Sequence, residues 1–212
     1  MNSWMFPDAC LIIFAKASEP GKVKTRLLPA ISAGQAAALQ SRLLFETLEL
    51  THRQRLCRIQ LWCSPSTGHP DFRRALNRYP ISLHTQVGTD LGDRMERAIA
   101  TNLERFTVVV LIGCDCPSLT LQDLIDTLSA LHRDSDVAIG PAEDGGYVLI
   151  GMKQPVPQLF RNMQWGTSAV LSETRFRIKS LELQCFETRE QWDIDRPEDL
   201  KRYQSYFAKK EN

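Results

Sequence analysis

Residues 107–119, TVVVLIGCDCPSL, constrain the fold of this chain more than any other stretch. The stretch opens with six apolar or β-branched residues without alternation, a pattern typical of a strand buried on both faces. The run stops at Gly113, so Asp115 is expected at the carboxyl end of the strand. Ligands of open parallel sheets bind outside those ends, where an acid can hold a cation or a polar substrate group. As an alternative, Asp115 or Ser118 caps the helix expected from residue 121.

A second unbroken apolar run, residues 9–15, predicts another buried strand and is followed by a basic loop. Backbone N–H groups at the start of a helix, together with Lys and Arg side chains, favour phosphate binding, so this loop is a candidate phosphate cradle. The loop is not a P-loop, because Gly21-Lys22 is followed by Val23. A solvated basic loop is the structural alternative. The cations of the loop are Lys16, Lys22, Lys24 and Arg26.

Helices and strands are expected to alternate through the rest of the chain, which predicts a three-layer α/β fold with a largely parallel sheet. Ser32 is a candidate N-cap, and Pro197 fits the first turn of the last helix. Helices are expected at residues 32–50, 71–77, 91–103 and 121–131, in a stretch opened by residues 165–168 and reaching about 176, and from 197. Strands are expected at residues 57–63, 81–86, 136–141, 147–151 and 181–186.

Two glycine-containing turns lie beside these elements. Gly88 and Gly92 flank Asp90 and allow a backbone to approach a flat ligand closely, although they also fit a plain turn into the next helix. Residues 143–147 combine two acids with a glycine pair and a tyrosine. Because Asp-Gly is a strong turn signal, this segment is also explained by a hairpin.

Two carboxylates remain at element junctions far apart in the sequence. Asp115 follows the central strand, and Asp195, with Asp193 nearby, lies just outside the last helix where the helix dipole does not explain it. If the fold brings Asp115 and Asp195 together, carboxylates without His or Cys partners favour Mg²⁺ or Mn²⁺ over Zn²⁺. Enzymes commonly use a hard cation together with Lys and Arg side chains to stabilise a departing phosphate or diphosphate.

Length, charge and cysteine content limit the classes of protein to which this chain can belong. With 212 residues the chain can form one sizeable core, and a single domain spanning residues 1–212 is expected. A formal net charge of +1 gives no electrostatic argument for a nucleic-acid or membrane partner. The six cysteines lie mostly in apolar runs, Cys114 and Cys116 among them, and indicate reduced packing thiols in a cytoplasmic protein. The apolar run at 9–15 is too short to span a bilayer.

Five motifs resemble, in order and over nearly the whole chain, those of a bacterial family of GT-A-type transferases in the nucleotide-diphospho-sugar transferase superfamily. Members are often described as glycosyltransferases and are linked in part to radical-SAM and arsenosugar gene neighbourhoods. The chain is more distantly similar to molybdenum-cofactor and 2-phospholactate guanylyltransferases. The motifs are residues 14–17 with 20–27 (FAKA and PGKVKTRL), 90–95 (DLGDRM), 112–117 (IGCDCP), 144–147 (DGGY) and 193–200 (DIDRPEDL).

The resemblance implies a role for each motif within a Rossmann-like GT-A fold with a mixed, mostly parallel sheet. It implies nucleotide-phosphate contacts from Lys16, Lys22, Lys24 and Arg26, and a metal ligand at Asp115 with Asp195 as the second. It places Gly88, Leu91 and Gly92 near the base or ribose, and Asp144, Gly145, Gly146 and Tyr147 near the acceptor. Because position 114 is Cys, the metal motif has one acid instead of a D-x-D pair, so Asp195 or Asp193 must complete the coordination.

These observations predict a Mg²⁺- or Mn²⁺-dependent transferase with a nucleotide-activated donor, most simply a nucleotide sugar that gives its glycosyl group to a small acceptor. Asp115 and Lys24 are expected to stabilise the leaving diphosphate, and Asp144 to orient or deprotonate the acceptor. The first alternative is transfer of a nucleotidyl group from a triphosphate to a phosphorylated acceptor, with release of pyrophosphate. The second is a non-catalytic nucleotide-binding protein on the same scaffold. The base, the sugar, the acceptor and the oligomeric state stay open.

Overall fold

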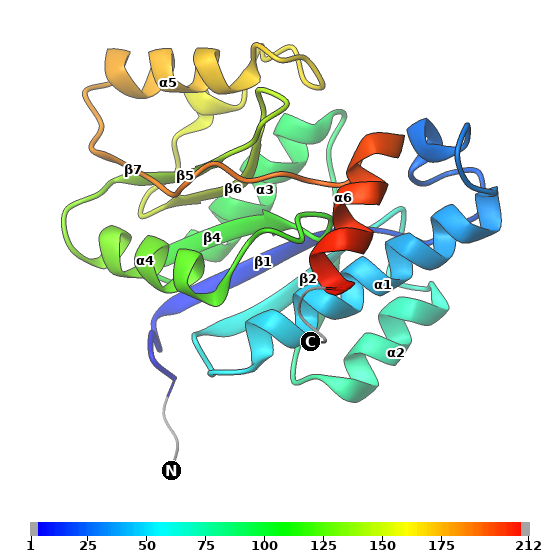
Figure 1. The fold of residues 1–212 in the computed structure, drawn as a ribbon. Helices are drawn as coiled ribbons and strands as arrows, with labels where there is room; N and C mark the ends of the chain where they lie inside the picture. Colours follow the sequence, from blue (N-terminus) through cyan, green and yellow to red (C-terminus); the bar gives the residue numbers. More distant parts are fainter. Residues whose placement is uncertain (1–3, 209–212) are drawn as a thin grey trace.

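A seven-stranded sheet runs through residues 4–208, the part of the chain that the computed structural model describes (Figure 1). The strand order is β3-β2-β1-β4-β6-β5-β7, and only β6 runs antiparallel to its two neighbours. The predicted mixed, mostly parallel sheet is therefore confirmed. The strands are β1 (Ala9–Lys16), β2 (Arg58–Ser64), β3 (Ser82–Thr85), β4 (Val108–Gly113), β5 (Val137–Pro141), β6 (Tyr147–Met152) and β7 (Cys185–Glu187).

Helices cover both faces of this sheet and complete the predicted three layers (Figure 1). Buried side chains of α1, α2 and α4 form one apolar cluster with the sheet, and those of α3 and α5 form a second cluster on the opposite face. A smaller cluster joins α6 to α1. The helices are α1 (Ala33–His52), α2 (Pro70–Arg78), α3 (Leu91–Leu103), α4 (Leu121–His132), α5 (Val170–Ser180) and α6 (Pro197–Ala208), with 3₁₀ turns η1 (Thr25–Leu27) and η2 (Pro157–Leu159).

Strand β4 has the burial that its unbroken apolar run predicts. Val110 and Ile112 pack into the cluster of α1, α2 and α4, whereas Val109 and Leu111 pack into the cluster of α3 and α5. Alternate side chains of a strand point to opposite faces, so a strand between two helical layers needs apolar residues at every position.

The ends of the helices decide between alternatives that the sequence leaves open. Ser32 caps α1 in a capping box with Gln35, as predicted. Helix α4 is capped by Thr120, whose side chain accepts a hydrogen bond from Asp123 N. The reading of Asp115 or Ser118 as the cap of this helix is therefore wrong, because Thr120 already supplies the oxygen that its first turn needs.

Three segments with predicted site residues meet at one edge of the sheet. Phe14 of β1 pairs with Gly113 of β4, so the basic loop and Asp115 leave neighbouring strand ends. Ile112 pairs with Leu149 of the antiparallel β6, which brings the turn before β6 to the same edge. This turn joins β5 and β6 as a hairpin, as its Asp-Gly signal predicts. No helix within residues 4–208 is long and apolar enough to cross a membrane.

Candidate active site

A cleft of about 420 Å³ opens at the carboxyl ends of β1 and β4. Its walls come from the end of β1, the basic loop, the start of α3 and the residues after β4. The cleft thus lies where ligands of open α/β sheets bind. The predicted site residues that line it are Lys16, Lys22, Lys24, Arg26, Leu91, Asp115 and Asp195.

The basic loop is tied to the end of β4 by a partly buried ion pair. Lys24 has a left-handed backbone (φ 48°), its side chain is 6 % exposed, and its Nζ donates to Asp115 Oδ2 at 2.8 Å. The same Nζ donates to Ile194 O at 2.6 Å. Burial favours a neutral amine, but the adjacent carboxylate outweighs it and the pKa of Lys24 lies above its ordinary value. Burial likewise opposes ionisation of Asp115, and Lys24 reverses this and lowers the pKa of that carboxyl.

The loop makes a second, exposed ion pair with the segment before α6. Arg26 Nη1 donates to Asp195 Oδ2, with side chains 63 % and 34 % exposed. Lys22 pairs with Glu19 within the loop. In this structure, therefore, two predicted phosphate-binding cations, Lys24 and Arg26, neutralise the two predicted cation-binding acids.

Asp193 shares the electrostatic environment of Asp115 more closely than the sequence indicates. Ile194 N donates to Asp115 O at 3.1 Å, which fixes the residue after Asp193 against the backbone of Asp115. Burial, and then the negative charges of Asp115 and Asp144, raise the pKa of Asp193 to about 7. Like charges at one site raise a pKa in this way. Within residues 4–208, no three His, Cys, Asp or Glu side chains already surround a point where a metal ion would fit.

The chemistry of these acids still fits a hard divalent cation. Asp193 interacts electrostatically with Asp115, with Asp144 and with the ammonium of Lys24. Mg²⁺ commonly binds through one or two protein carboxylates and completes its coordination with waters and substrate phosphates. A pair of acids beside a cleft of about 420 Å³ that is lined by Lys and Arg satisfies that requirement.

At the start of α3, the predicted residues divide into one that lines the cleft and two that serve packing. Leu91 lines the cleft and is 45 % exposed. A Cβ on Gly88 would lie 2.7 Å from Arg94 N, and a Cβ on Gly92 would lie 2.5 Å from Trp165 Nε1. Any larger residue at these two positions would collide with its neighbour, so Gly88 allows the preceding turn to pack on α3, and Gly92 allows α3 to pack against Trp165.

The turn before β6 is built together with residues 165–171. Gly145 has φ +86°, and a Cβ there would lie 2.3 Å from Ser168 O. Asp144 is exposed, and its Oδ1 accepts a hydrogen bond from Gly146 N at 2.8 Å. Tyr147 packs edge-on against Trp165, and burial raises the pKa of its hydroxyl. Glu143 N donates to Gln191 O at 3.0 Å, which brings the turn with Asp144 against the segment that leads to Asp193, and the charge of Asp144 contributes to the raised pKa of Asp193.

Sequence reasoning missed several residues of this region. Gln86 and Arg94 line the cleft, and Trp165 packs between Gly92 and Tyr147. The glycines beside Gln86 and Arg94 were a usable signal, because a close backbone approach implies functional neighbours. Trp165 carried no such signal, since the pattern around it predicts only the start of a helix.

Comparison with solved structures identifies the fold. A protein from Desulfovibrio desulfuricans G20, provisionally described as a nucleotide-diphospho-sugar transferase, is 29 % identical, with a TM-score of 0.81 over 90 % of this chain and 84 % of that chain. A 4-diphosphocytidyl-2C-methyl-D-erythritol synthase from Anaerococcus prevotii DSM 20548 is 14 % identical, with a TM-score of 0.63 over 95 % and 96 %. CMP:2-keto-3-deoxy-manno-octonic acid synthetase complexed with CTP is 11 % identical, with a TM-score of 0.61 over 96 % and 99 %.

The chain therefore has the nucleotide-diphospho-sugar transferase fold, which both sugar transferases and nucleotidyltransferases use. Residues 47–167 match the model of the family described as "Uncharacterized protein conserved in bacteria (DUF2064)", and the chain belongs to that family. No curated protein gives a significant match to the sequence.

Proposed function

We propose that this protein is a metal-dependent transferase that moves a glycosyl group from a nucleotide sugar to a small acceptor. The observation that carries the proposal is the cleft itself, in which the cations of the basic loop face Asp115 and Asp195, with Asp193 directly beside them. Cations and a cluster of carboxylates at the carboxyl edge of a parallel sheet are suited to a diphosphate and its counter-ion.

In this mechanism, Lys16, Lys22 and Arg26 bind the phosphates of the donor, because they line the cleft from the strand end and the loop. Asp115 and Asp193 would hold Mg²⁺ or Mn²⁺, while Asp195 forms the exposed ion pair with Arg26 that a donor phosphate would replace. The bound cation would supply electrostatic stabilisation of the departing diphosphate. Lys24 adds a fixed positive charge beside Asp115. That charge would stabilise the negative charge that grows on the diphosphate as it leaves.

The acceptor belongs on the side of the turn before β6. Asp144 is exposed at that turn and interacts electrostatically with Asp193, so it lies near the acidic end of the cleft. A carboxylate in this place is equipped to orient an acceptor hydroxyl or to take its proton. Tyr147 and Trp165 supply aromatic surface beside it.

Nucleotidyl transfer is the second candidate. It is favoured by the similarity of the fold to two cytidylyl-transferring synthases, one of them complexed with CTP. The basic loop suits a triphosphate as well as a diphosphate. The two candidates differ in the bond that breaks, and so in whether pyrophosphate is released.

A thermal-shift panel of nucleoside diphosphates, triphosphates and nucleotide sugars, with and without Mg²⁺ or Mn²⁺, tests the proposal. A ligand that binds only the folded state raises Tm by mass action. A cation-dependent rise with one nucleotide sugar and its diphosphate supports glycosyl transfer. A selective rise with one triphosphate, followed by pyrophosphate release with a phosphorylated acceptor, supports the second candidate. Nucleotide binding that EDTA leaves unchanged supports a non-catalytic binding protein and contradicts both.

A further inference from the structure

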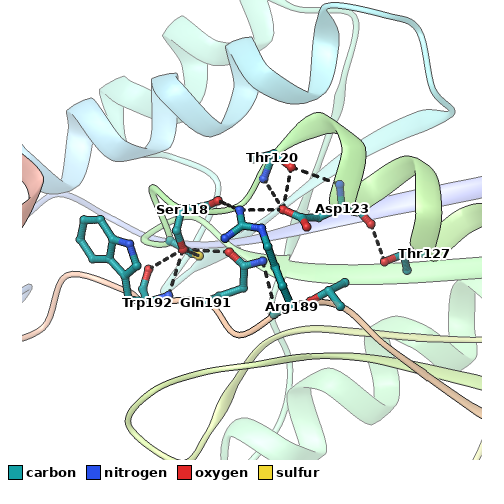
Figure 2. Close-up of polar contacts among 9 residues, drawn as sticks. Ser118, Thr120, Asp123, Thr127, Arg189, Gln191 and Trp192 are labelled. Carbon is teal, nitrogen blue, oxygen red and sulfur yellow. Dashed lines mark hydrogen bonds and ion pairs between the residues drawn. The ribbon is translucent and has the colours of Figure 1, made fainter. Parts of the chain in front are cut away.

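A buried polar cluster on the inner side of the candidate site plays no part in the proposed chemistry. It joins the residues after β4 to residues 189–192, the segment that leads to Asp193 (Figure 2). Ser118 is 4 % exposed and Gln191 is fully buried. Burying a polar group costs free energy unless the group is hydrogen-bonded. The hydrogen bonds of this cluster therefore hold its residues in fixed positions.

The hydroxyl of Ser118 uses both of its hydrogen-bonding capacities on one segment. Its Oγ accepts from Trp192 N at 2.9 Å and donates to Gln191 Oε1 at 2.8 Å (Figure 2). The carbonyl of Ser118 also accepts a hydrogen bond from Arg189 Nη2 at 2.5 Å. Ser118 therefore binds residues 189, 191 and 192, and one of these hydrogen bonds holds the backbone of the residue immediately before Asp193.

Gln191 connects the same segment to the third acid. Its backbone N donates to Pro141 O at 2.8 Å, and its carbonyl accepts from Glu143 N at 3.0 Å. Asp144 follows in the next position. One buried side-chain pair, Ser118 with Gln191, thus lies between the segments that carry Asp115, Asp144 and Asp193.

We infer that Ser118 is a positioning residue, which through Gln191 and Trp192 holds Asp193 at the distance from Asp115 that a divalent cation requires. The inference rests on the proposed function, because it concerns the cation of that site. Asp193 is repelled by both Asp115 and Asp144, so these carboxylates separate unless their backbones are fixed. The bonds of Ser118 to Trp192 and Gln191, and those of the Gln191 backbone to residues 141 and 143, join the three segments without contacting the cation itself. Residues that orient metal ligands in this way change metal affinity by about 10–100-fold when they are replaced.

Mn²⁺ binding to purified variants, measured by electron paramagnetic resonance with and without UDP, tests the inference. We expect Ser118→Ala to weaken Mn²⁺ binding about tenfold or more, and Ser118→Thr, which keeps the hydroxyl, to recover most of the affinity. Thr127→Val is the matched control. It also removes a fully buried hydroxyl of the region drawn in Figure 2, but that hydroxyl donates only to Asp123 O within α4.

Tm and circular dichroism of each variant separate positioning from general loss of stability. If Ser118→Ala and Thr127→Val lose similar stability but only the first loses Mn²⁺ affinity, positioning is supported. If Ser118→Ala does not fold, Gln191→Met removes the partner of the hydroxyl and should give the same selective loss. A folded variant without the Ser118–Gln191 bond that binds Mn²⁺ like wild type overturns the inference alone. A wild-type protein that binds no Mn²⁺ in either condition overturns the inference together with the cation in the proposed function.

Discussion

The two ion pairs that join the basic loop to the acids of the cleft have the same chemistry but different surroundings. Lys24 is 6 % exposed at the Asp115 pair, and its Nζ also bonds Ile194 O. Arg26 is 63 % exposed at the Asp195 pair. Buried pairs are fixed and are costly to break on one side, whereas exposed pairs contribute little to stability and exchange partners easily.

This difference separates two tasks within one loop. Lys24 is held so firmly that it sets the position of the loop against β4, and its charge stays at Asp115. Arg26 can leave Asp195 for a phosphate at little cost, since water screens both groups. In the proposed function, the contrast therefore gives Lys24 the role of the permanent charge and Arg26 that of the exchangeable phosphate contact.

Asp115→Asn should give the largest effect. The amide keeps the shape of the side chain but loses the charge that Lys24 and a cation require, so we expect turnover to fall about 10³-fold or more. The measurement is the initial rate with the nucleotide donor that the thermal-shift panel selects. Asp134→Asn, an exposed acid beyond the far end of α4, is the control and should retain the wild-type rate. If Asp115→Asn turns over at the wild-type rate, Asp115 does not take part in the reaction.

Lys24→Met should come next, as a loss of stability. The substitution leaves the Asp115 carboxylate without its partner, and because that side chain is 37 % exposed we expect a loss of about 2 kcal/mol, less than for a fully buried pair. Urea unfolding measures the effect, and Arg26→Met is the matched control at the exposed pair. The control should unfold at nearly the wild-type urea concentration. Equal losses in the two variants would contradict the division of tasks.

How far the sequence predicts this site depends on whether the information is local. The run of Val and Leu before Gly113 predicts a strand buried on both faces, because burial at every position leaves a pattern within a few residues. The cations of the loop and the acids at element ends are predictable for the same reason. Ser32 marks its helix through a side-chain oxygen that accepts a hydrogen bond from the first turn, and Pro197 through its fixed backbone φ.

The pairings between these residues were not predictable, because they arise from the order of the strands. Lys24 meets Asp115 only since β1 and β4 are neighbours, and Asp144 approaches Asp193 only since β6 is inserted antiparallel between β4 and β5. No local pattern encodes that insertion. The sequence consequently assigned Lys24 and Asp115 to two different ligands, whereas the structure pairs them with each other.

Metal-free nucleotide binding should show the smallest and most diagnostic effect. In the metal-free site, a phosphate held by Arg26 meets the negative charge of the Asp115 carboxylate, and that carboxylate also neutralises the positive charge of Lys24. Asp115→Asn removes this repulsion and leaves the charge of Lys24 uncompensated, so in EDTA it should bind a nucleoside diphosphate about fivefold more tightly than wild type, which corresponds to about 1 kcal/mol. Isothermal titration calorimetry measures the change, and Asp134→Asn should bind like wild type. If Asp115 is only a metal ligand and lies far from the phosphates, Asp115→Asn should not change nucleotide affinity in the absence of metal. Tighter binding by a variant with lost turnover would instead mean that the Asp115 carboxylate faces the phosphates and that a cation must neutralise its charge when the donor binds.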